Sequence, residues 1–440
     1  MLKLPFANRI PVARLQSNLV AERLTASLLA KFSKRQRSPA IRHSTETSIF
    51  DETGPDDAGL RINIRDIDKD EHDASQARER GLFLARQDRW EDLVQELEQA
   101  EHARTTTASG QPISDLIAFG ARGDVVNAVE HALSENHRTD DRALIQGVMA
   151  LESARLDLGQ PALMTALVAL THIDLGWIWR SKTGAHYCAR THKQRAQRHF
   201  SRAASLLTPL EGEPLNSPLI AAAKCALYPH VPAPALEVAD AYAALIDLAP
   251  ENNRHMRALG TALLPQQADG SWDTLELEAR RTAARTESIW GMGGYTWVYF
   301  DALLCDAQAA SQLDVSLFVE GLQDILAKDP NQATINLITA YCGIAAKRSL
   351  EEEPAGAELR TELSDMAEWL ARNRLCEIHP LTWAHASKGF ANNVPDTSLA
   401  RFASRGKDAA RHYLADLFAS ELCSGQTVTY TPAGVELAAG

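Results

Sequence analysis

Long hydrophobic runs are missing from this chain of 440 residues. No stretch reaches about 18 consecutive apolar residues, so we expect no segment that spans a membrane. Glycine and proline are also scarce, with 24 and 19 residues, which excludes a collagen-like or low-complexity chain. With 45% hydrophobic and 23% charged residues, the composition is that of an ordinary globular protein.

Closely spaced cysteine pairs are missing as well. The six cysteines are far apart and form no CxxC motif, which argues against a zinc ribbon or a small disulfide framework. Most of them lie in apolar helical contexts, as Cys225 and Cys305 do. We therefore expect free, buried thiols and a reducing, cytoplasmic location.

Signatures of catalysis are not found either. The chain contains no P-loop, no GxSxG elbow and no HExxH pair, the motifs that mark phosphate binding, a serine nucleophile and a zinc hydrolase. The glycines that follow Trp290 lack the GxGxxG spacing of a dinucleotide site. We expect no catalytic residue and no cofactor, and an enzyme is the minority interpretation.

The net charge of −12 is unevenly distributed along the chain. Residues 1–44 carry nine Lys and Arg and a single acid, Glu22, so this segment has a charge of +8 and the remainder has −20. Because an acidic body repels phosphate backbones, nucleic acid is not an expected partner.

The basic N-terminal arm, residues 1–43, is amphipathic, since apolar residues recur three to five apart from Leu15 onward. It has no continuous apolar segment with a cleavage site, as a secretory signal would. Four interpretations of this arm stay open: a membrane-surface helix formed by residues 1–42, a transit peptide, a docking helix for a partner, and a helix packed on the body. Residues 44–76 follow as an acidic, mobile linker with one weak strand at 60–64.

Helical periodicity dominates from residue 77 onward, and alternating β-branched residues are nearly absent. Small and large residues recur at intervals that scatter around about 34 residues. The clearest positions are Gly81, Trp90, Tyr187, Phe200, Pro209, Tyr242, Pro250, Leu259, Gly260, Leu322, Pro330 and Ala340. Over roughly residues 74–348 these intervals resemble the tetratricopeptide repeat.

This resemblance implies an all-α fold, an α-solenoid of stacked antiparallel helix pairs over residues 77–348. Pairs must stack because one pair cannot bury its own apolar face. A helical C-terminal cap at 349–423 and a tail at 424–440, with alternating residues typical of a loose strand, complete the predicted organisation. A different helical repeat or bundle is the alternative.

The resemblance to the tetratricopeptide repeat also implies which residues face a partner-binding groove. The densest aromatic cluster lies between Trp290 and Phe300, and polar-tipped aromatic side chains suit a recognition surface. Arg254 and Arg257 lie one repeat earlier in the chain. These two arginines could hold a carboxylate, such as the C-terminus of a peptide. The alternatives are an enlarged core and a solvated helix face. The predicted groove residues are Arg254, Arg257, Tyr295, Trp297 and Tyr299.

Histidine occurs densely in one region, which prompts a test for a metal site. The candidate ligands are His186, Cys188, His192 and His199. Lys193 and Arg195 lie among them and oppose a bound cation, so we expect no metal. The segment 379–385 contains two histidines but no third ligand nearby.

The function predicted from these patterns is a non-catalytic scaffold that binds a protein or peptide in a concave helical groove. A helical enzyme or metabolite sensor with a pocket around residues 290–306 is the second hypothesis. A membrane-surface adaptor that uses the basic N-terminal arm is the third. The identity of the partner and the oligomeric state stay open.

Overall fold

The computed structural model describes residues 59–65, 69–134, 141–181, 189–210, 216–230, 233–265, 271–388, 399–432 and 434–439. Most of these residues are helical and the strands are short. The predicted all-α class is therefore confirmed. The basic N-terminal arm lies outside the described residues.

The first half of the protein is a set of helices around one hydrophobic core, which extends from Ala74 to Leu227. Apolar residues at helical spacing build this core, as the buried residues Leu93, Leu97 and Ala100 show in one helix. The helices are α2 (Lys69–Arg86), α3 (Trp90–Ala103), α4 (Ile113–Ser134), α5 (Asp141–Asp157), α6 (Ala162–Ser181), α7 (Ala189–Leu207), η3 (Thr208–Leu210) and α8 (Pro218–Cys225).

The second half surrounds a second hydrophobic core. Several of its helices begin at a side-chain cap that accepts a backbone hydrogen bond, for example Asn252, Ser271 and Asp314. The helices are α9 (Ala235–Leu248), α10 (Asn253–Ala262), α11 (Trp272–Trp290), α12 (Gly293–Cys305), η4 (Ala307–Ser311), α13 (Val315–Lys328), α14 (Gln332–Ala340), η5 (Tyr341–Ala346), α15 (Lys347–Ser349), η6 (Pro354–Gly356), α16 (Ala357–Asn373), α17 (Pro380–Lys388), α18 (Leu399–Leu417) and α19 (Ala419–Cys423).

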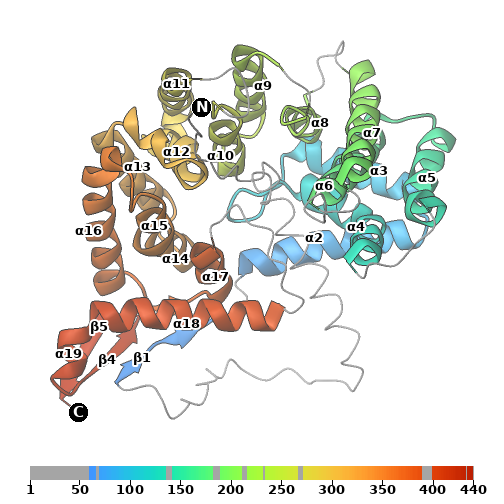
Figure 1. The fold of residues 1–440 in the computed structure, drawn as a ribbon. Coiled ribbons are helices and arrows are strands. Elements are labelled where there is room, and N and C mark those ends of the chain that lie inside the picture. The colour runs from blue at the N-terminus through green and yellow to red at the C-terminus, as the bar shows by residue number, and fades with distance from the viewer. Residues whose placement is uncertain are drawn as a thin grey trace, which may run out of the picture.

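Helices that alternate along the chain lie side by side in several places. The α2 helix packs on α4, α4 on α6, α6 on α8, and α10 on α12. Neighbours in sequence also pack together, most extensively α6 with α7, α11 with α12 and α17 with α18. In Figure 1 the helices follow one another around an arc from α2 to α18.

Glycine permits the closest of these helix crossings. A Cβ atom on Gly120 of α4 would lie 1.8 Å from the carbonyl oxygen of Arg78 in α2. A Cβ atom on Gly260 of α10 would lie 1.8 Å from the carbonyl oxygen of Val298 in α12. The backbones touch at these points, and no larger residue fits without a shift of the helices.

Two small sheets join the beginning of the described chain to its end. Strand β1 (Leu60–Arg61) pairs in parallel with β4 (Gln426–Thr431), which pairs antiparallel with β5 (Gly434–Ala439). Strand β2 (Asn63–Ile64) pairs in parallel with β3 (Glu377–Ile378). The weak strand expected at 60–64 and the alternating residues of the tail thus meet in one structure, visible at the lower edge of Figure 1.

Two sequence expectations change in detail. The α2 helix begins at Lys69, inside the segment 44–76 that we expected to be a mobile linker. Length and composition alone would allow α6 to cross a membrane, although it contains no long uninterrupted apolar run. The most apolar 18-residue stretch of α6 is 94% buried inside the protein. The helix is therefore a core helix of this fold.

Candidate functional site

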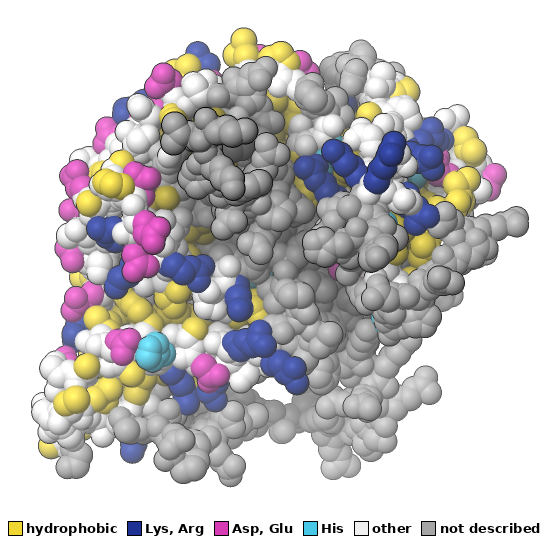
Figure 2. All heavy atoms as spheres, in the orientation of Figure 1, with side chains coloured by type: hydrophobic (Ala, Val, Ile, Leu, Met, Phe, Trp, Pro, Cys, Tyr) yellow, Lys and Arg dark blue, Asp and Glu magenta, His cyan; other side chains and the backbone are white. Residues whose placement is uncertain are grey.

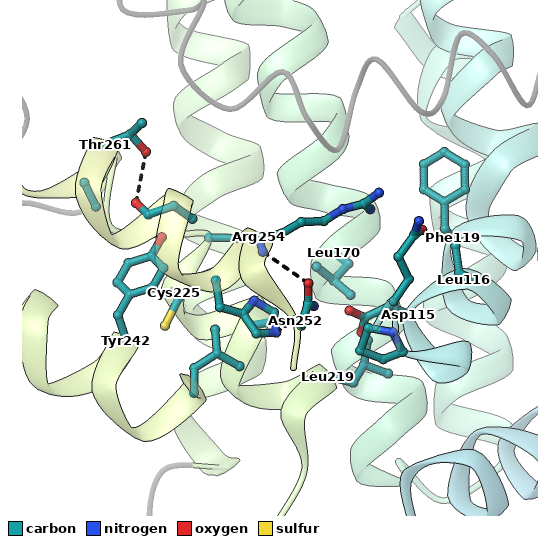
Figure 3. Close-up of a pocket in the computed structure, with 18 of the residues that line it drawn as sticks. Asp115, Leu116, Phe119, Leu170, Leu219, Cys225, Tyr242, Asn252, Arg254 and Thr261 are labelled. Atoms are coloured by element: carbon teal, nitrogen blue, oxygen red, sulfur yellow. Dashed lines mark hydrogen bonds between the residues drawn. The ribbon is translucent and has the colours of Figure 1, made fainter. Parts of the chain in front are cut away.

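A cavity of about 160 Å³ lies where the two hydrophobic cores meet. Helices α4 and α8 form its wall on the side of the first core, and α9 and α10 form the wall on the other side (Figure 3). Much of the lining is apolar, as expected of a binding site for an organic ligand. The main apolar lining residues are Leu116, Phe119, Leu170, Leu219, Tyr242 and Leu245.

Buried ion pairs fix two charged residues in the cavity wall. Asp301 of α12 accepts two hydrogen bonds from Arg257, at 3.0 Å from Nε and 2.8 Å from Nη2. Arg122 of α4 donates from Nε to Asp174 of α6 at 2.7 Å. Each pair compensates its own charge in a region that excludes water, so both pairs hold helices together.

Asp115 and Arg254 are the half-buried charged residues of the cavity. Asp115 extends from α4 and Arg254 from α10 toward the same space (Figure 3). The side chain of Asn252 caps α10 by accepting a hydrogen bond from the backbone N–H of Arg254 at 3.3 Å. This cap places Arg254 in the first turn of α10, beside the cavity.

Gln111, which precedes α4, provides an unsatisfied polar atom at the cavity. Its Nε2 donates to Ser109 Oγ at 3.2 Å and to Asp70 Oδ2 at 3.4 Å. Its Oε1 is buried and has no hydrogen-bond partner among the residues that the structure describes. Because a buried acceptor is costly to leave unpaired, a ligand N–H or O–H group is the natural partner for this oxygen.

Two titratable side chains in the lining, His255 and Cys225, are neutral. Burial, assisted by the charge of Arg254, lowers the pKa of His255 to about 3. The neutral ring accepts a hydrogen bond at Nε2 from Asn252 Nδ2 at 3.0 Å. Burial raises the pKa of the Cys225 thiol to about 12. An unionised thiol is a weak nucleophile, so these groups favour binding over covalent chemistry.

The three aromatic side chains predicted to line the groove are buried instead. Tyr295, Trp297 and Tyr299 are 0%, 1% and 0% exposed. The hydroxyl groups of both tyrosines donate to Glu276 Oε2 of α11, at 2.7 and 2.8 Å. Their helix, α12, packs against α10, α11 and α13, so no face of it remains open. The prediction that these residues are exposed anchors is therefore wrong.

The two predicted arginines have different surroundings. Arg257 is 8% exposed and bound to Asp301, so it is part of the core. Arg254 lines the cavity. Of the region 290–306, where we expected a pocket, the cavity wall includes Asp301. Nothing in the sequence pattern indicated Gln111 or Asp115 as lining residues.

His199 of the histidine-rich region belongs to a hydrogen-bonded chain with His172 and Glu152. His199 Nδ1 lies 3.0 Å from His172 Nδ1, and His172 Nε2 lies 3.2 Å from Glu152 Oε1. His186 and Cys188 lie outside the described residues. Within the described ranges, no three side chains are grouped in a way that could hold a metal ion.

No protein-family description, curated protein or solved structure matches the chain. The function proposed below therefore rests on the cavity and the helix packing.

Proposed function

We propose that the protein is a non-catalytic binding protein, a tetratricopeptide-like α-solenoid that takes the carboxyl end of a partner's peptide chain into the cavity. The observation that carries this proposal is the cavity itself, which combines an apolar lining with Arg254 and Asp115. Ligand sites of this kind have mostly apolar walls and a few polar groups that orient the ligand.

The packing of alternate helices supports the solenoid part of this proposal. In a helical repeat array, each helix contacts its partner in the same repeat and the equivalent helix of the next repeat. The contacts of α2 with α4, α4 with α6 and α6 with α8 follow this rule, as do those of α10 with α12. Helices α4 and α8 of this series form one wall of the cavity, and α9 and α10 form the other.

The chemistry of the lining supports a peptide end as the ligand. The guanidinium of Arg254 can bind a terminal carboxylate through charge-assisted hydrogen bonds. The side chains of Leu116, Leu219 and Leu245 can enclose an apolar terminal side chain. Gln111 Oε1 can accept a hydrogen bond from a peptide N–H.

We expect Arg254→Gln to weaken binding of the tripeptide acetyl-Ala-Ala-Leu about tenfold or more. A hydrogen bond to a charged group contributes about 1.5–3 kcal/mol, and the glutamine amide carries no charge. Isothermal titration calorimetry on the full chain measures the affinity. Amidation of the tripeptide removes its terminal negative charge. The wild-type protein should therefore bind the amide no more tightly than the Arg254→Gln variant binds the free acid.

A matched control is Arg285→Gln, which removes an exposed arginine of α11 that pairs with Asp247. This variant should bind the tripeptide as the wild type does. Ala222→Phe, which fills the cavity from α8, should abolish binding. Equal affinities for acid and amide, or full binding by Ala222→Phe, would contradict the proposal.

A small-metabolite sensor is the second candidate, and the modest cavity volume of about 160 Å³ favours it. If free leucine binds as tightly as the tripeptide, this candidate replaces the first. A cytoplasmic location belongs to the proposal and is supported by free thiols at Cys225, Cys305, Cys342, Cys376 and Cys423. The membrane-surface adaptor stays a prediction, because it depends on residues 1–42.

A further inference from the structure

The α7 helix carries charge of one sign in a protein whose net charge is −12. Its 19 residues contain no Asp or Glu. Figure 2 shows basic side chains gathered at the upper right, where α7 lies in Figure 1. The basic residues of the helix are Arg190, Lys193, Arg195, Arg198 and Arg202.

Two of these five residues have structural contacts. Arg202 donates to both oxygens of Glu152, at 2.7 and 2.9 Å. The guanidinium of Arg195 lies 4.6 Å from the ring centroid of Trp179. Such contacts fix the side chains against α5 and α6.

The other three basic side chains of α7 are exposed. We call Arg190, Lys193 and Arg198 the α7 basic face. None of them forms an ion pair with any residue in the described part of the chain. They therefore project three positive charges into solvent.

The elements packed on α7 do not neutralise this face. The acidic side chains of α5 and α6 near α7 are already bound to arginine, Glu152 to Arg202 and Asp174 to Arg122. The α8 helix has no acidic residue. The same neighbours add two further basic residues, Arg180 and Lys224.

Helix α11 shows that many arginines alone do not create such a face. Its three arginines each bind a carboxylate: Arg280 binds Glu276 and Asp314, Arg281 binds Glu278, and Arg285 binds Asp247. Paired charges of this kind cancel at short range. The α7 basic face differs because its charges have no such carboxylate partner among the residues that the structure describes.

We propose that the α7 basic face is a docking surface for a short acidic segment of a partner protein. The α7 basic face, from Arg190 to Arg198, spans about 12 Å at 1.5 Å per residue. An extended peptide rises about 3.3 Å per residue, so about four consecutive Asp or Glu residues match this length. This surface is separate from the cavity and does not depend on the function proposed for it.

Charge favours a short acidic peptide over a longer polyanion. The whole chain has a net charge of −12, and repulsion acts over about 10 Å at ordinary salt. A nucleic acid strand or a membrane extends beyond α7 and is disfavoured by the net negative charge of the whole chain. A segment of about four residues stays within the basic face.

The test uses a fluorescein-labelled tetraglutamate peptide and fluorescence anisotropy on the full chain at 50 mM NaCl. The triple variant Arg190→Gln, Lys193→Gln, Arg198→Gln should bind the peptide at least tenfold more weakly than the wild type. Raising the salt to 300 mM should weaken binding by the wild type. These side chains are exposed, and circular dichroism will confirm that the helices are retained.

The matched control is the triple variant Arg280→Gln, Arg281→Gln, Arg285→Gln, which lowers the net charge equally. It should bind tetraglutamate within twofold of the wild type, and so should Arg254→Gln, which tests the cavity separately. Equal loss in the α11 variant, or no loss in the α7 variant, would overturn the proposal. Tighter binding of a 12-nucleotide single strand or of phosphatidylserine vesicles would overturn it as well.

Discussion

Replacing Gly120 with alanine is expected to destabilise the protein, whereas the same change at Gly123, one turn further along α4, should stabilise it. The added Cβ at position 120 would lie 1.8 Å from the carbonyl oxygen of Arg78. Helices α2 and α4 would have to separate, and forcing extra volume into a packed core costs about 1–3 kcal/mol, occasionally more. The added Cβ would meet the rigid backbone of α2. We therefore expect the loss of stability at Gly120 to lie at the upper end of that range.

Gly123 is the matched control because it is in the same helix. The nearest atom to its added Cβ is Asn127 Nδ2 at 4.0 Å, so alanine fits without a clash. Alanine in a helix interior is favoured over glycine by up to about 1 kcal/mol. Urea unfolding followed by circular dichroism compares the two variants. A change of the same sign in both would show that the crossing of α2 and α4 is looser than described.

Acid is expected to destabilise the protein strongly between pH 6.5 and about 4. Burial lowers the pKa of His199 and His385 to about 4, and that of His230 and His255 to about 3. Burial also lowers the pKa of His172. In the unfolded chain these groups titrate near 6.5. The folded state thus binds fewer protons, and its stability falls as the pH drops below 6.5.

The size of this effect follows from the number of buried histidines. Each contributes about 1.4 kcal/mol per pH unit between its unfolded and folded pKa values. Several such groups together approach the whole stability of a typical domain, about 5–15 kcal/mol. Thermal unfolding at pH 7.5, 6.5, 5.5 and 4.5 measures the loss.

Two variants assign the acid effect to buried histidine. His385→Phe removes a buried ring that packs on Phe402 and should reduce the pH dependence. His412→Asn removes a ring that is 82% exposed and should leave the pH dependence unchanged. A melting temperature that is constant from pH 7.5 to 4.5 would contradict the buried, neutral state of these histidines.

Helix positions were predictable from sequence because local patterns determine them. The small residues Gly81 and Gly260, recognised from the repeat spacing, do lie at helix crossings. The segment 349–423, expected to be a helical cap, contains α16, α17, α18 and α19. Capping residues and 3.6-residue periodicity act over a few residues, so one sequence contains the necessary information.

Whether a side chain is buried or exposed was not predictable in the same way. Periodicity places Tyr295 and Tyr299 on one face of α12, but it does not say whether another helix covers that face. Helices α11 and α13 do cover it, and Glu276 receives both hydroxyl groups. The cavity was hidden for a related reason. Asp115 and Arg254 are distant in sequence, and only the fold places both of them in the wall of one cavity.

The pairing of β1 with β4 has a consequence for synthesis of the chain. Leu60 pairs with Val428, so almost the whole protein must leave the ribosome before this contact can form. Contacts between such distant residues also carry a large loop-closure entropy and form slowly. The helices can fold progressively as they emerge. Residues 60–64 cannot pair until β3 and β4 have been synthesised. Joining the two ends is thus expected to be the last step of folding, and a nascent chain that stops before residue 426 leaves β1 without a sheet.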